Sequence, residues 1–313
     1  MEYIDFNSLL AESIKKHWNL DALTDYEGKT LQYNDVARKI EKLHILFENA
    51  GVAKGDKIAL CGKDSAVWVT AFMATVTYGA TVVPILPDFN PVDITHIINH
   101  SEAELLFVSD QIWEHIEFDK LLNVKGVISL NSKKLLAEAE CADIKKELRL
   151  LRRRFNAKYK NGFTRDHIVY PEIDNSQMLV LNYTSGTTGF PKGVMLTHRN
   201  IVNNGKTIGD RMDLSTADRM MIQVPMFHCF GMVLSMTASM THGGTLCPLP
   251  YFSPRPALAC INKEHITCFN GVPTMFIALL GHPDFAKTDF SYMRTGIMAG
   301  SPCPISVMNE VVE

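Results

Sequence analysis

The sequence lacks paired cysteines, an excess of basic charge and a secretion signal, and each absence narrows its function. Seven cysteines are scattered over 313 residues without a C-x-x-C pair, which favours reduced thiols in a cytoplasmic protein over a disulfide framework or a zinc site. A net charge of −3 argues against a dedicated nucleic-acid-binding protein. Near the N-terminus, Leu9, Leu10 and Ile14 stand among charged residues, the spacing of an amphipathic helix and not of a signal peptide.

Charged residues are also absent from 66–86, a stretch of 21 residues that is long enough to cross a bilayer. Gly79 divides this stretch into a helix-like half and a β-branched half, 81–83, which ends at Pro84. We therefore expect a buried helix, a turn and a buried parallel strand, and no transmembrane segment.

The chain is longer than a typical single domain, and it contains a faint internal repeat. Residues 56–85 and 218–249 each contain a strand-like run, a charge-poor helix and a Gly-Thr stretch. These features predict an α/β fold of two related βαβ-type lobes with mainly parallel sheets. We expect the first lobe at 1–174, with a basic connecting segment at about 143–170. The second lobe, 175–313, would carry a glycine-rich loop.

The basic segment has two interpretations. Between residues 145 and 165 the sequence holds nine Lys or Arg residues and one acid, Glu147. The segment could be a patch that binds anions or a membrane surface. It could instead be a solvated helix between the lobes, with Leu148, Leu151 and Phe155 facing inward. We favour the solvated helix, because few aromatic residues accompany the cations.

A glycine-rich and hydroxyl-rich loop lies between two apolar, strand-like runs, 178–183 and 193–197. Glycines let backbone N–H groups approach an anion, and a strand followed by such a loop is where a polyphosphate can be bound. The lysine follows Pro191 and precedes Gly193, so the loop is not a Walker A loop, and a Rossmann G-x-G-x-x-G is absent. A flexible linker rarely stands between two apolar strands. Further hydrogen-bond donors are the ammonium group of Lys192 and four hydroxyls, those of Thr184, Ser185, Thr187 and Thr188.

Residues 184–192, T-S-G-T-T-G-F-P-K, resemble without a departure the phosphate-loop signature of the acyl-adenylate-forming superfamily. This superfamily includes acyl-CoA synthetases, luciferases and peptide-synthetase adenylation domains. Three further segments resemble family segments in the right order: P-x-x-H-x-x-G at 225–231, G-V-P-T at 271–274, and a G-G-A-P-type loop at 296–302. The resemblance spans almost the whole chain and is most like a fatty-acid or acyl-CoA synthetase.

The resemblance implies roles for individual residues. The carboxylate substrate attacks the α-phosphorus of ATP and pyrophosphate leaves, so hydrogen-bond donors and Mg²⁺ must disperse charge, and no side-chain nucleophile is needed. Thr187 would be the hydroxyl on the Mg²⁺ side. His228 alone would more often be a core histidine, but its place in the family segment favours the acyl site. The implied acyl-adenylate site is His228, Gly300, Ser301 and Pro302, and the implied ATP-phosphate site is Thr184, Ser185, Gly186, Thr187, Thr188, Gly189 and Lys192.

By the same resemblance, the Mg²⁺-binding glutamate, the ribose-binding aspartate and the small domain with the catalytic lysine would follow Glu313. We therefore expect these 313 residues to be the N-terminal portion of a ligase and to be inactive alone. The parent is expected to activate a carboxylic acid, with a fatty acid favoured, and to pass it to coenzyme A in the cytoplasm. The alternatives are an aryl-acid or amino-acid adenylation domain, or a non-catalytic nucleotide-binding fragment. The sequence leaves open whether the protein forms a homo-oligomer.

Overall fold

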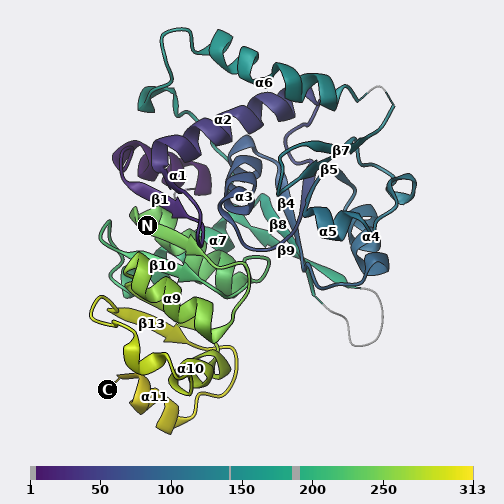
Figure 1. Cartoon of the computed structure of the whole chain (residues 1–313). Helices are drawn as coiled ribbons and strands as arrows, with labels where there is room; N and C mark the ends of the chain where they lie inside the picture. The colour runs from purple at the N-terminus through teal and green to yellow at the C-terminus, as the bar shows by residue number, and fades with distance from the viewer. Residues whose placement is uncertain (1–4, 141, 185–190, 313) are drawn as a thin grey trace. The chain divides into compact units, whose positions relative to one another are not determined.

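The computed structural model describes residues 5–140, 142–184 and 191–312. The chain divides into two compact units, each with one sheet flanked by helices (Figure 1). Most neighbouring strands in both sheets run parallel, so the expected α/β fold with mainly parallel sheets is confirmed. The first unit comprises Met1–Trp18, Asn34–Lys63 and Val67–Val202, and the second comprises Asn19–Tyr33, Asp64–Ala66 and Asn203–Glu313.

The first unit is built on a seven-stranded sheet of order β7-β6-β5-β3-β4-β8-β9. Its strands are β3 (Lys57–Cys61), β4 (Thr81–Ile85), β5 (Ala103–Val108), β6 (Gly126–Ser129), β7 (Leu135–Glu138), β8 (Met178–Thr184) and β9 (Lys192–Thr197). Its helices are α1 (Phe6–Lys16), α2 (Tyr33–Asn49), α3 (Ala66–Tyr78), α4 (Pro91–His100), α5 (Asp110–Trp113), η1 (Phe118–Lys120), α6 (Ile144–Lys158), η2 (Arg165–His167) and the start of α7 (His198–Arg211).

The second unit is built on a six-stranded sheet of order β13-β12-β10-β11-β1-β2. Its strands are β1 (Asp21–Thr24), β2 (Thr30–Gln32), β10 (Arg219–Ile222), β11 (Thr245–Pro248), β12 (Cys268–Gly271) and β13 (Thr295–Met298). Its helices, besides the end of α7, are the π-helix η3 (Phe230–Thr237), α8 (Ala238–His242), α9 (Pro254–Glu264), α10 (Pro273–Leu280), η4 (Phe285–Lys287) and α11 (Ile305–Val312).

The internal repeat of the sequence is a structural repeat. In the first unit β3, α3 and β4 form a parallel strand–helix–strand unit, and in the second β10, η3 with α8, and β11 form another. In the first repeat the Thr81 N–H donates to the Asp56 carbonyl at 2.8 Å, and in the second the Thr245 N–H donates to the Asp218 carbonyl at 2.8 Å. The aspartate and the threonine therefore start the two paired strands in the same way in both units.

The charge-free stretch folds as expected. It forms α3, a turn at Gly79 with φ of +93°, and the fully buried strand β4. Within the residues that the structure describes, no helix combines the length and the apolar composition needed to span a membrane.

The division into units differs from the expected boundary at 174/175. Strand β8 pairs in parallel with β4 through Val82 and Val180, so the β8–β9 hairpin extends the first sheet and belongs to the first unit. The expected basic connecting segment also lies within the first unit, where Lys158 of α6 forms an ion pair of 2.7 Å with Glu41 of α2. Tertiary strand pairing, which the local sequence does not encode, moved this boundary.

One carboxylate joins the starts of three neighbouring strands in the second sheet. Asp218 precedes β10, Thr267 precedes β12, and Arg294 precedes β13. Asp218 Oδ1 accepts from the Thr267 hydroxyl at 2.7 Å, and Arg294 donates to both carboxylate oxygens, at 3.1 and 2.8 Å. Burial alone would raise the pKa of Asp218, but hydrogen bonds from Thr267 and Arg294 outweigh it and lower the pKa. The ionised carboxylate thus fixes the relative position of three strands.

Replacing Arg294 by Met should destabilise the second unit by about 3 kcal/mol, because it leaves the buried Asp218 charge without its cation. Urea denaturation measures this loss. The matched change Lys287→Gln removes an exposed ion pair with Asp284 and should cost less than about 0.5 kcal/mol. Equal losses in the two variants would contradict the role given to Asp218.

A second buried carboxylate holds the turn that follows β10. Asp64 is 8% exposed, and its Oδ1 accepts the Met226 N–H at 3.0 Å. Burial raises the pKa of Asp64 to about 7, although the hydrogen bond from Met226 opposes the rise. Asp64 is therefore an acceptor for a backbone group two residues before His228.

The raised pKa predicts a pH-dependent effect of Asp64→Asn. Between the unfolded pKa near 4 and the folded value near 7, the folded protein binds the additional proton, so the Asp64 contribution to stability falls as pH rises. Asparagine keeps the acceptor and removes the ionisation. The variant should gain about 2 kcal/mol relative to wild type between pH 5 and pH 8. Urea denaturation at both pH values checks this; a pH-independent difference would refute it.

Candidate functional site

The β8–β9 hairpin presents the two described ends of the predicted phosphate loop. Thr184 ends β8, Lys192 begins β9, and the two residues are paired across the antiparallel ladder. Both are exposed. Among the described residues, no acid forms an ion pair with Lys192. Ser185, Gly186, Thr187, Thr188 and Gly189 lie outside the described residues.

The base of this hairpin is held by an aromatic side chain. Tyr183 is 4% exposed, and its hydroxyl lies 2.6 Å from His100 Nδ1 at the end of α4. Its ring also lies over Gly193, where a β-carbon would come within 3.3 Å of the ring and 2.9 Å of Leu181 Cδ1. Burial raises the pKa of the Tyr183 hydroxyl, so it stays protonated. Tyr183 therefore fixes the strand ends from which Thr184 and Lys192 project.

His228 lies in a tight turn after β10 in the second unit. A β-carbon at Gly231 would overlap the carbonyl oxygens of Val224 and Pro225, so only glycine permits this close approach of the backbone. The turn leads directly into the π-helix η3, a form that often occurs at functional sites. His228 is exposed, and its Nδ1 accepts the Phe230 N–H at 3.2 Å. The ring is oriented by the turn itself.

Cys229, next to His228, is also exposed. Its Sγ lies 3.9 Å from His228 Nδ1. The hydrogen bond to Cys229 raises the pKa of His228, and the same contact lowers the pKa of Cys229, in each case against the effect of burial. The pair places an ionisable group of each sign at the surface of this turn.

The predicted acyl-adenylate residues lie at one edge of the six-stranded sheet. The His228 turn follows β10, and Gly300, Ser301 and Pro302 follow β13. Strand β12 pairs with both β10 and β13, so the three carboxyl ends are adjacent. Gly300 has φ of +89°, and a β-carbon there would lie 3.0 Å from Val272, which follows β12. Ligands of open parallel sheets bind at this edge.

Two buried polar residues at this edge were not predicted from the sequence. Gln223 donates to the Asn270 carbonyl, and Asn270 donates to the Leu234 carbonyl and the Ser235 hydroxyl of η3, both at 3.2 Å. Within the described residues, Gln223 Oε1 and Asn270 Oδ1 are buried without a hydrogen-bond partner. Their signal in the sequence is a polar residue in each apolar run: Gln223 directly follows β10, and Asn270 lies within β12.

Comparisons with known proteins agree with this architecture. Among curated proteins, a Bacillus subtilis protein, YngI, whose name provisionally assigns it as an acyl-CoA synthetase, is 37% identical over 281 residues, which cover 84% of this chain and 50% of YngI. The acyl-CoA ligase sidI of Aspergillus fumigatus is 31% identical over 303 residues, which cover 92% of this chain and 49% of sidI. The crystal structure of the N-terminal domain of FACL13 from Mycobacterium tuberculosis matches with a TM-score of 0.80 at 21% identity, over 99% of this chain and 73% of that chain.

These matches define what the chain shares with its relatives. The chain spans about half the length of the curated relatives it matches. The similarity to FACL13 shows the fold. The family model described as AMP-binding enzyme matches residues 10–313, nearly the whole chain. The chain therefore belongs to the AMP-binding enzyme family.

Proposed function

We propose that this chain supplies the ATP-phosphate site and part of the acyl site of an enzyme that converts a carboxylic acid, and specifically a fatty acid, to an acyl-adenylate and then to an acyl-CoA. The observation that carries the proposal is the hairpin that sets Thr184 opposite Lys192, in a chain that matches the AMP-binding family from residue 10 to residue 313. The names of the acyl-CoA synthetase and acyl-CoA ligase relatives support this reaction class.

In this proposal the hairpin binds the polyphosphate of ATP. Lys192 contributes an exposed cation, and Thr184 contributes a hydroxyl and backbone groups on the opposite strand. The donor set of the loop, which includes the hydroxyl of Thr187, suits a triphosphate with Mg²⁺, which shares phosphate oxygens with few protein ligands. Bound Mg²⁺ would stabilise charge on the departing pyrophosphate. The part played by this chain is to position the phosphates and to supply donors.

The acyl-adenylate would lie at the carboxyl edge of the second sheet. The exposed ring of His228 and the backbone of Gly300, Ser301 and Pro302 border this edge. Asp64 holds the backbone of the His228 turn, so it acts as a positioning residue and not as a catalytic one. Coenzyme A would accept the acyl group in the second half of the reaction.

The test uses stable mimics of an acyl-adenylate. Sulfamoyl adenosines that carry a dodecanoyl, benzoyl or alanyl group are titrated into the 313-residue chain by calorimetry, together with ATP. The dodecanoyl mimic should bind at least about tenfold tighter than the other two, because each buried methylene contributes about 0.8 kcal/mol. Lys192→Ala should weaken ATP binding about tenfold. It should leave the mimics unaffected, because they carry no β- or γ-phosphate.

Lys15→Ala, an exposed cation on α1, is the matched control and should leave all affinities unchanged. If the benzoyl or alanyl mimic binds more tightly than the dodecanoyl mimic, the substrate is an aryl acid or an amino acid and not a fatty acid. A chain that binds neither ATP nor any mimic would overturn the proposal.

Tyr183→Phe tests how the hairpin is held. The variant keeps the ring over Gly193 and loses the hydrogen bond with His100, which is worth roughly 1 kcal/mol. ATP affinity should fall about three- to fivefold, and affinity for the dodecanoyl mimic should not change. A variant that is destabilised in thermal denaturation but binds ATP as wild type would show that the bond serves only the fold.

A further inference from the structure

Helix α6 of the first unit exposes a stripe of cations. Its inward face is formed by Ile144, Leu148, Leu151 and Phe155, of which Ile144 and Phe155 are buried and the two leucines half-buried. With about 3.6 residues per turn, one third of the helix circumference, from the flank of the inward face round to the side opposite it, carries four exposed cations over about 12 Å of its length. These cations are Lys145, Arg149, Arg152 and Arg153.

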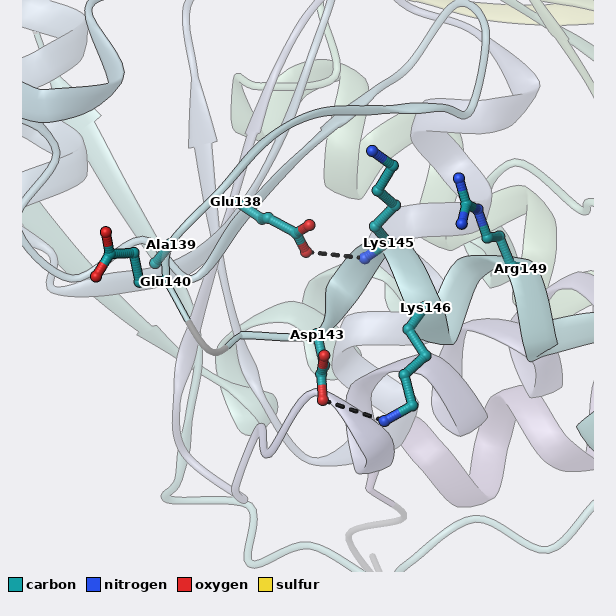
Figure 2. A pocket seen from close by; sticks show the side chains of 7 residues that line it. All are labelled: Glu138, Ala139, Glu140, Asp143, Lys145, Lys146 and Arg149. Atoms are coloured by element: carbon teal, nitrogen blue, oxygen red, sulfur yellow. Dashed lines mark hydrogen bonds and ion pairs between the residues drawn. The ribbon is translucent and has the colours of Figure 1, made fainter.

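Two acidic side chains on or beside α6 are paired with other cations. Glu147 pairs with Arg154 at 2.7 Å. Asp143 pairs with Lys146 at 3.2 Å, and Glu138 accepts the backbone N–H of Lys145 and not its ammonium group. Figure 2 shows the Asp143–Lys146 and Glu138–Lys145 contacts beside a surface hollow of about 400 Å³, with the Lys145 and Arg149 side chains extended on the same side of the helix.

No ion-pair partner is found within the described ranges for any of the four cations in the stripe. The exposed Glu140 borders the hollow and is the remaining acid there. It lies at the N-terminal end of the helix, away from Arg152 and Arg153 in the sequence. The middle of the stripe is therefore uncompensated positive charge.

The neighbouring helix α2 adds further positive charge beside α6. The Lys42 ammonium lies 5.2 Å from the centre of the Phe155 ring. Burial lowers the pKa of Lys39, and the nearby charges of Lys133 and Lys42 lower it further, against the effect of Asp35. An external anion beside Lys39 and Lys42 would offset the repulsion between these like charges.

The charge of the chain is strongly uneven. Nine basic residues and one acid give residues 145–165 a net charge of +8, whereas the rest of the chain, with 22 basic and 33 acidic residues, carries −11. An anionic surface would therefore attract the α6 face and repel the remainder of the chain. This asymmetry selects one orientation of approach.

We propose that the outward face of α6, with Lys145, Arg149, Arg152 and Arg153, docks on the surface of an anionic lipid bilayer. The four charges are spread over about 12 Å along one exposed helix, so they match an extended layer of headgroups better than a single small anion. Single-stranded nucleic acid would need aromatic side chains for stacking, and this face has none. The docking is electrostatic, because the apolar face of α6 packs inward.

The test is flotation of the 313-residue chain with vesicles of phosphatidylcholine alone or with 30% phosphatidylglycerol. Binding should require phosphatidylglycerol and disappear at about 0.5 M NaCl, because salt screens exposed charges. Each basic residue near an anionic bilayer contributes roughly a fivefold factor. Replacing the four cations of the stripe by Gln should therefore lower vesicle binding at least about 100-fold.

The matched control carries Lys15→Gln, Lys16→Gln, Lys29→Gln and Lys54→Gln, which changes the net charge equally at exposed positions elsewhere and should bind as wild type. Circular dichroism confirms that both variants fold. The proposal would be overturned if phosphatidylglycerol did not increase vesicle binding of the wild type, or if the variant of the four cations bound vesicles as the wild type does. Duplex DNA that binds as tightly as the anionic vesicles would also overturn it, in favour of a general polyanion surface. Because the readout is flotation and not ligand affinity, this result is independent of the proposed acyl-CoA synthetase activity.

Discussion

The ionised carboxylate of Asp218 is the interaction on which the second unit depends. It receives hydrogen bonds from residues that precede β12 and β13, and it precedes β10 itself, so one side chain sets the register of three parallel strands. Because the three strands are aligned, the loops that follow them lie next to one another at the opposite edge of the sheet. The positions of His228 and Gly300 therefore follow from an ion pair at the far end of the strands.

In the first unit, an antiparallel hairpin positions the candidate binding residues. A parallel strand must leave its sheet at the carboxyl edge, whereas β9 returns antiparallel beside β8 and brings Lys192 back opposite Thr184. The connection is thus held at both ends by one ladder, and Tyr183 packs at its base. Such a hairpin can present a short glycine-rich segment without a helix N-terminus, which distinguishes this arrangement from Walker A and Rossmann loops.

Local sequence patterns predicted the helices and strands. Pairing between segments far apart in the sequence determined the unit boundary and the partners of buried polar residues. The charge-free stretch, the repeated Asp and Gly-Thr positions and the two strands around the loop were all predictable, because each depends on residues close in sequence. The boundary at 174/175 failed because β8 adds to β4, almost 100 residues earlier. Asp64 was missed for the same reason, since its partner Met226 is 162 residues away. In the sequence, Gln223 and Asn270 are visible only as polar residues directly after β10 and within β12.

Charge composition alone could not decide the meaning of the basic segment. The sequence favoured a solvated helix, and the structure bears out its inward stripe of apolar residues. What the sequence could not show is which cations keep a partner: Lys158 and Arg154 are paired with Glu41 and Glu147 beside the packed face, and Lys146 is paired with Asp143 at the start of the helix. Among the described residues, the positive charge of α6 that no acid pairs with is concentrated on Lys145, Arg149, Arg152 and Arg153. A helix that was merely solvated would gain nothing from that segregation, whereas a docking face requires it.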